Sequence, residues 1–222
     1  MSTRMAGILL LAALAASLAT AGLSRDVRLP AGLALTLVAA ITARTAGLSA
    51  ADVGLARDSW RAGLRWGGAA AALVAAGYVV AALVVESLPE PRYDSWSEAV
   101  LAGLVLIPLG TVIPEELAFR GVLWGLLRRA RGTRIATLVS SALFGLWHVV
   151  PALGGGPANV AIAGVVGSGG VGKLFGVLAT VVLTGAAGIL LCYLRQRSDS
   201  LLAPVLLHWA ANSGGVLLVL LG

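Results

Sequence analysis

The long apolar runs of this sequence constrain its fold more than any other feature. A helix needs about 20 apolar residues to cross the hydrocarbon core of a bilayer. Runs near that length recur along the 222-residue chain, and the candidate spans are 6–23, 29–43, 67–85, 98–127, 135–152, 173–194 and 201–221. The sequence therefore predicts an all-α fold, a polytopic transmembrane helical bundle of about seven spans.

The charge content agrees with this prediction. Only 12% of the residues are charged and 59% are hydrophobic, whereas about a quarter of a soluble domain is charged. Most of the surface is therefore expected to face lipid, as in an integral, multi-pass membrane protein. The net charge of +6 does not indicate nucleic-acid binding, because the basic residues lie in short clusters between apolar runs.

The distribution of these clusters predicts an orientation. With the N-terminus on the cytoplasmic side, eleven basic residues fall in cytoplasmic segments and four on the opposite side. This excess follows the positive-inside rule and is expected for a bacterial plasma membrane. The cytoplasmic set is Arg4, Arg44, Arg57, Arg61, Arg65, Arg128, Arg129, Arg131, Arg134, Arg195 and Arg197. Alternatively, residues 1–21 are a cleaved signal peptide, because an Ala-x-Ala site follows the first run.

The chain is interpreted as one bundle with two functional regions. Residues 1–97 are expected to hold the N-terminal spans, with a cytoplasmic interfacial segment at 44–66. Within it, Arg57, Arg61 and Arg65 recur at helical spacing and predict a short helix in the headgroup layer. Residues 98–222 are expected to form the catalytic core.

A charged motif interrupts the fourth apolar run. "VIPEELAFRGVLWG" contains Glu115, Glu116 and Arg120. A charge at the centre of a bilayer costs at least about 2.5–3.5 kcal/mol, so such residues usually face the bundle interior. Glu116 and Arg120 are four residues apart and can pair on one helix face, which leaves Glu115 for another task. The alternative is that the motif is only a structural ion pair between helices.

Two histidines favour a functional site. His148 and His208 are the only histidines of the chain, and each lies in a different apolar run. Asn212 follows His208 by four residues and shares its helix face. Counted at about 1.5 Å per residue from the flanking arginines, Glu115, His148 and His208 lie at similar depth. The sequence therefore predicts that these groups converge in one cavity.

Three motifs resemble one protein family. "EELAFR" (115–120) resembles the E-E-x-x-x-R motif of the CPBP family, the CAAX-protease and bacteriocin-processing enzymes that are also called Abi proteins. "FGLWH" (144–148) is similar to that family's F-x-x-x-H motif, and "HWAAN" (208–212) resembles its third motif, which begins with histidine. The motifs occur in the family's order, each on its own span.

The resemblance implies an intramembrane, glutamate-type endopeptidase that hydrolyses a membrane-embedded or lipid-modified protein substrate without a metal or other cofactor. Glu115 would match the catalytic glutamate that activates water together with His148. His208 and Asn212 would match the pair that holds the oxyanion. Glu116, Arg120 and Phe144 would have supporting roles. The chemistry is consistent, because amide hydrolysis needs a general base and donors aimed at the developing oxyanion.

Other readings of the same residues stay open. His148, His208 and Glu115 have the composition of a His₂Glu zinc site, which would leave a fourth position for water. A non-enzymatic immunity factor or scaffold protein of the same fold is a second alternative. A proton-coupled transporter is a third, although the sequence contains none of the internal repeats that are common in transporters.

Overall fold

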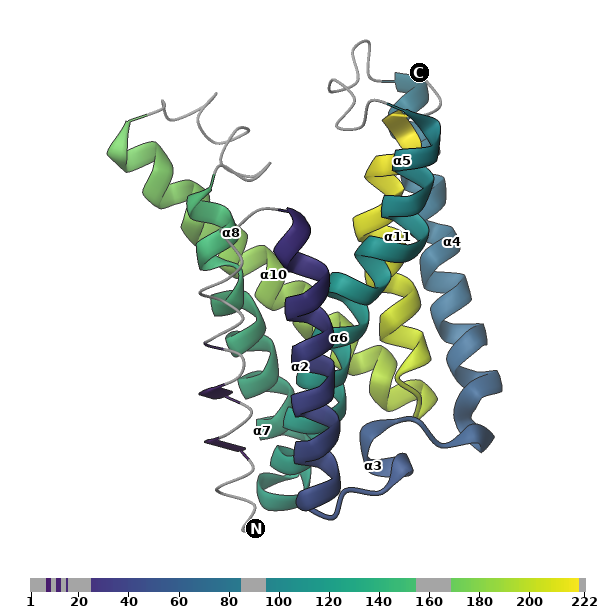
Figure 1. Cartoon of the computed structure of the whole chain (residues 1–222), viewed down its shortest axis with the longest axis vertical. Coiled ribbons are helices and arrows are strands. Elements are labelled where there is room, and N and C mark those ends of the chain that lie inside the picture. Colours follow the sequence, from purple (N-terminus) through teal and green to yellow (C-terminus); the bar gives the residue numbers. More distant parts are fainter. Residues whose placement is uncertain are drawn as a thin grey trace.

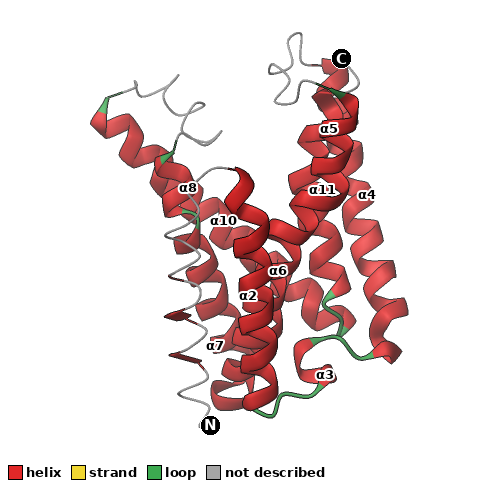
Figure 2. Ribbon diagram, in the orientation of Figure 1, coloured by secondary structure: helices red, strands yellow, loops and turns green. Residues whose placement is uncertain are grey.

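The computed structural model describes residues 7–8, 11–12, 15, 25–84, 95–154 and 169–219. Every regular element in these ranges is a helix, as the all-α prediction requires (Figure 2). Most of the first predicted span, 6–23, and the signal-peptide alternative at 1–21 lie outside the described residues.

Figure 1 shows how the described helices are arranged. Their bounds are α2 (Arg25–Thr45), α3 (Ala50–Val53), the 3₁₀ turn η1 (Arg57–Ser59), α4 (Trp60–Val84), α5 (Trp96–Leu101), the π-helical segments η2 (Ala102–Leu106) and η3 (Pro108–Val112), α6 (Ile113–Glu116), the π-helical segment η4 (Leu117–Leu123), α7 (Trp124–Trp147), α8 (Val149–Leu153), α10 (Gly170–Ser198) and α11 (Leu202–Val219).

Four helical stretches of the described chain are long and apolar enough to cross a membrane. They are Val27–Thr45, Ala50–Val84, Trp96–Leu153 and Gly170–Ser198. The 58-residue stretch contains two predicted spans, 98–127 and 135–152, and breaks between them at Gly132. There the backbone has φ 81° and ψ 170°, a conformation that glycine adopts readily. The chain is an integral membrane protein, and the total of seven spans stays a prediction.

The structure differs from the prediction of a separate interfacial helix at 57–66. α4 begins at Trp60 and continues without a break to Val84, so residues 60–66 form the first turns of a long helix. Two glycines explain how this part of α4 packs. A Cβ atom at Gly63 would lie 2.5 Å from Ser200 Oγ, and one at Gly67 would lie 2.7 Å from the Cα of Ala203. These turns therefore pack directly against the α10–α11 connection and the first turn of α11.

Three arginine-rich segments, 44–65, 128–134 and 195–197, meet at the end of the bundle where α3 lies in Figure 1. Arg129 donates to Asp52 Oδ2 at 2.7 Å, and Arg195 donates to the carbonyls of Ala51 and Asp52 at 3.1 and 3.0 Å. Gly54, at φ 79°, leaves no room for a side chain, since a Cβ atom there would lie 2.5 Å from Arg195 Nε. These contacts join α3 to α7 and α10.

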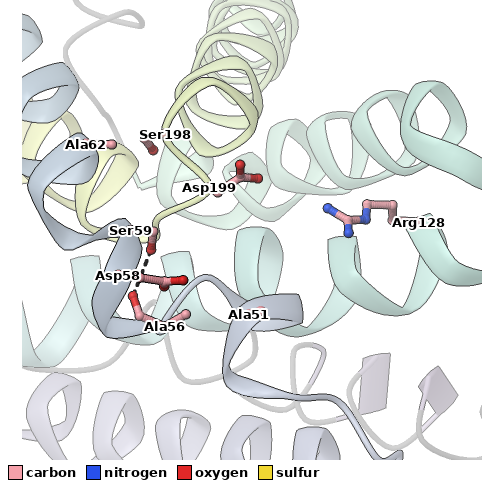
Figure 3. Close-up of a pocket in the computed structure, with 8 residues that line it drawn as sticks. All are labelled: Ala51, Ala56, Asp58, Ser59, Ala62, Arg128, Ser198 and Asp199. Carbon is pink, nitrogen blue, oxygen red and sulfur yellow. Dashed lines mark hydrogen bonds between the residues drawn. The ribbon is translucent and has the colours of Figure 1, made fainter.

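A surface pocket of about 460 Å³ opens at this end. Its lining includes Asp58, Arg128 and Asp199, which are all exposed side chains (Figure 3). In Figure 1, α6 lies near the middle of the bundle, between α2 and α11, so the pocket and the glutamates of the motif occupy different levels.

The helix that leads to the glutamates is wound with π turns. The N–H of Ile107 donates to Ala102 O, and that of Ile113 to Pro108 O, each five residues back. Such turns are frequent at functional sites, and each changes the face that the following residues present. α2 packs closely here, because a Cβ atom at Gly32 would lie 2.4 Å from the carbonyl oxygen of Gly110. The backbone before Glu115 is therefore covered by a neighbouring helix.

Candidate active site

A buried carboxylate connects two of the sequence motifs. Glu116, which is fully buried at the end of α6, accepts hydrogen bonds at Oε1 from Arg120 Nη1 at 3.0 Å and from His208 Nδ1 at 2.8 Å. The predicted pairing of Glu116 with Arg120 is confirmed. The contact with His208 joins α6 to α11 and orients the imidazole, because its Nδ1–H faces the carboxylate.

Glu115 lies in the same cluster with only one of its oxygens engaged. Glu115 is 8% exposed, and its Oε1 accepts a hydrogen bond from Trp147 Nε1 at 3.0 Å. The second oxygen, Oε2, is buried and has no hydrogen-bond partner among the described residues. It lies 3.9 Å from His208 Nε2, which is too long for a direct hydrogen bond. A water molecule is the usual bridge across such a separation.

Asn212 lies beside the same imidazole. Its Nδ2 is 3.2 Å from His208 Nε2, one turn along α11, as predicted from the four-residue spacing. Glu116 holds the proton on Nδ1, so Nε2 can accept one hydrogen from this amide. The Nδ2 group carries a second hydrogen, and Asn212 is exposed, so this hydrogen is available to a ligand.

His148 occupies the break between α7 and α8, where the backbone has φ −85° and ψ 0°. Its Nδ1 lies 2.8 Å from the carbonyl oxygen of Phe144, and because a carbonyl only accepts, Nδ1 carries the proton. In the neutral ring, Nε2 is therefore the acceptor. No hydrogen bond joins His148 to Glu115 in the described part of the chain.

Phe144 connects His148 to the rest of the cluster. Its ring lies edge-on to His148, with centroids 4.7 Å apart, and edge-on to His208 at 5.8 Å. The guanidinium carbon of Arg120 lies 3.9 Å from the centroid of the same ring. Phe144 thus packs against both histidines, and Arg120 packs against Phe144.

Trp147 was not among the predicted site residues. It lies within "FGLWH", but a tryptophan in an apolar run is normally read as core packing, and only the fold brings its N–H to Glu115. Its neighbour in the sequence, His148, carries the motif signal. The strongest clue to a role for Trp147 was therefore its position next to that histidine.

The structure also bears on the alternative of a His₂Glu zinc site. Among the described residues, no group of three histidine, cysteine, aspartate or glutamate side chains has an arrangement that could hold a metal ion. In particular, both ring nitrogens of His208 face protein groups, Glu116 at Nδ1 and Asn212 at Nε2.

The fold and the cluster define an integral membrane protein with a polar, partly unsatisfied site inside an apolar helical bundle. The family model described as type II CAAX prenyl endopeptidase, Rce1-like, matches residues 95–214. The chain belongs to this family, which makes it a CAAX-type endopeptidase. The match includes all seven predicted site residues, as the resemblance of the motifs implied. No curated protein and no solved structure among those compared with the chain matches it significantly.

Proposed function

We propose that the chain is an intramembrane endopeptidase in which Glu115 activates a water molecule to hydrolyse a peptide bond. The observation that carries the proposal is Glu115 Oε2, a buried carboxylate oxygen that has no hydrogen-bond partner in the described part of the chain and faces the His208–Asn212 pair. Glu116 also has one buried oxygen, Oε2, without a partner among the described residues, but its Oε1 already accepts from both Arg120 and His208. We therefore assign the structural role to Glu116 and Arg120.

In the proposed reaction, water lies between Glu115 Oε2 and the carbonyl carbon of the substrate. One proton of the water passes to Oε2 as the new O–C bond forms, and His148 Nε2 accepts a hydrogen bond from the same water. The carbonyl oxygen becomes an oxyanion, which Asn212 Nδ2–H stabilises. His208 Nε2 orients this amide by accepting its other hydrogen. As the C–N bond breaks, the proton on Glu115 passes to the leaving amine.

The family description indicates the substrate class. A type II CAAX prenyl endopeptidase is named for protein tails that carry a prenyl group, and an apolar bundle can hold such a chain beside the membrane. We therefore propose a membrane-associated, lipid-modified peptide as the substrate. We also propose that the N-terminus is cytoplasmic, because the three arginine-rich segments that meet at one end would then face the cytoplasm.

The test uses the full chain purified into liposomes. It is incubated with a synthetic peptide that ends in a farnesylated CAAX sequence, and the products are identified by mass spectrometry. We expect release of the last three residues, with slower release from the same peptide without the farnesyl group. A folded chain that leaves the farnesylated peptide uncut would refute this substrate class.

The mechanism also predicts the response to metal removal. If Glu115 acts directly on water, the reaction does not depend on a bound metal. Cleavage of the farnesylated peptide should then stay within about 2-fold of its initial rate after dialysis against a strong chelator. Metal content is measured on the same sample. Loss of activity that stoichiometric zinc restores would favour the His₂Glu alternative instead.

Asn212 supplies the next prediction. Asn212→Ala should lower kcat by about 100- to 1000-fold with little change in KM, the usual effect of removing one oxyanion donor. Ser213→Ala is the matched control, because Ser213 lies beside Asn212 on α11 and donates a hydrogen bond to Gly103 O of η2 at 3.0 Å. Should Asn212→Ala lower the melting temperature in detergent and leave kcat per folded molecule unchanged, Asn212 would be a packing residue.

A further inference from the structure

We infer that Trp147 is a positioning residue that selects Oε2 of Glu115 as the oxygen that acts on water. The inference rests on the proposed role of Glu115. Its starting point is the hydrogen bond from Trp147 Nε1 to Glu115 Oε1, at 3.0 Å and buried from solvent. An indole N–H can only donate a hydrogen bond. The bond therefore occupies Oε1 of the carboxylate and leaves Oε2 as the oxygen that can accept a proton from water.

The indole is itself held in place by aromatic packing. Trp147 is only 9% exposed, and its ring lies edge-on to Phe119, with centroids 5.8 Å apart and planes at 74°. Phe119 in turn lies edge-on to Phe144 at 5.3 Å. Edge-to-face pairs of this kind restrict ring orientation. The direction of the N–H is therefore fixed before any substrate binds.

The orientation of the carboxylate follows from this restraint. With Oε1 held by Trp147, the remaining oxygen faces His208 Nε2 at 3.9 Å. Without the indole donor, the carboxylate could rotate about its last bond, and either oxygen could turn toward the imidazole. A general base works only within hydrogen-bond reach of the proton that it removes, so freedom of this kind lowers the rate rather than substrate affinity.

Trp147 also couples two parts of the site. It is the last residue of α7, and His148 follows it at the helix break. The same short piece of backbone therefore places the donor on Glu115 and the ring that accepts from water. A shift of this helix end would move both groups together.

The test replaces Trp147 with phenylalanine, which keeps an aromatic ring and removes the N–H. With the farnesylated peptide as substrate, Trp147→Phe should lower kcat by about 10- to 100-fold, while KM changes by less than about 3-fold. The matched control is Trp124→Phe, because Trp124 Nε1 also donates to a side chain, Thr137 Oγ1 at 3.2 Å, away from the glutamates. The control should leave kcat per folded molecule unchanged.

The outcomes separate this inference from the proposed function. If the wild-type chain cleaves the peptide and Trp147→Phe retains wild-type kcat, only the positioning role is wrong. If the wild-type chain does not cleave the peptide, the proposed function is wrong, and the role of Trp147, which rests on it, is wrong as well.

A second measurement covers the case in which Trp147→Phe does not fold. The indole N–H resonances of ¹⁵N-labelled wild-type chain and Glu115→Gln are compared in micelles. The Trp147 signal should move when its acceptor loses its charge, and the Trp124 signal should not. An unmoved Trp147 signal would overturn the inference.

Discussion

Glu115→Gln is expected to lower kcat by about 100- to 10,000-fold and to leave the protein folded in the membrane. The range is that of a general base removed from a hydrolytic site, because glutamine cannot accept the proton of water. Folding should survive because the amide oxygen can still accept the hydrogen bond from Trp147, which engages only Oε1 of the native side chain. The substitution therefore removes the general base and preserves the fold.

The measurement is the rate of farnesylated-peptide cleavage per folded molecule, with the melting temperature recorded in the same detergent. Asp58→Asn is the matched control, because Asp58 is an exposed carboxylate at the arginine-rich end, where the pocket of Figure 3 lies. It should leave both quantities unchanged. A purified Glu115→Gln protein with near wild-type turnover would show that another group is the base.

Contacts within one helix could be predicted from spacing alone. Glu116 with Arg120 and His208 with Asn212 are both four residues apart, and both pairs lie in contact at 3.0 and 3.2 Å. Helix geometry places such residues on one face whatever the rest of the chain does. The apolar runs likewise predicted the helices, because length and hydropathy are local properties.

Contacts between helices could not be predicted in this way. His208 meets Glu116 across 92 residues, and Trp147 meets Glu115 across 32. The three π-helical segments before Trp124 also change which residues face inward, and no spacing rule for a regular helix includes them. The sequence thus identified the residues of the cluster but not the arrangement in which Glu116 bonds to Arg120 and His208 while Glu115 bonds to Trp147.

That arrangement changes what is expected of Glu116. On spacing alone, Glu116→Gln would break a single pair with Arg120. In the structure, both residues are fully buried, and Glu116 Oε1 accepts from Arg120 and His208 together. Removing the charge of one partner leaves a buried guanidinium uncompensated, which typically costs about 3–5 kcal/mol of stability.

We therefore expect Glu116→Gln to destabilise the folded protein by about that amount, measured by unfolding in mixed micelles. Asp52→Asn is the matched control, because Asp52 pairs with Arg129 at 2.7 Å where both side chains are partly exposed. Exposed pairs contribute about 0–1 kcal/mol. Equal losses of stability in the two variants would show that the buried Glu116–Arg120 pair stabilises the protein no more than an exposed pair does.

The double variant Glu116→Gln/Arg120→Met removes both charges of the buried pair and so tests whether the cost of Glu116→Gln comes from the unpaired guanidinium. Methionine keeps an apolar stem against the Phe144 ring, which the guanidinium now covers at 3.9 Å, and no unpaired charge stays buried. The double variant should be more stable than the sum of the single losses predicts, by about 1–3 kcal/mol, since the two residues share one network. Strict additivity would mean that Glu116 and Arg120 stabilise the bundle independently, and that the role of Glu116 is to orient His208 alone.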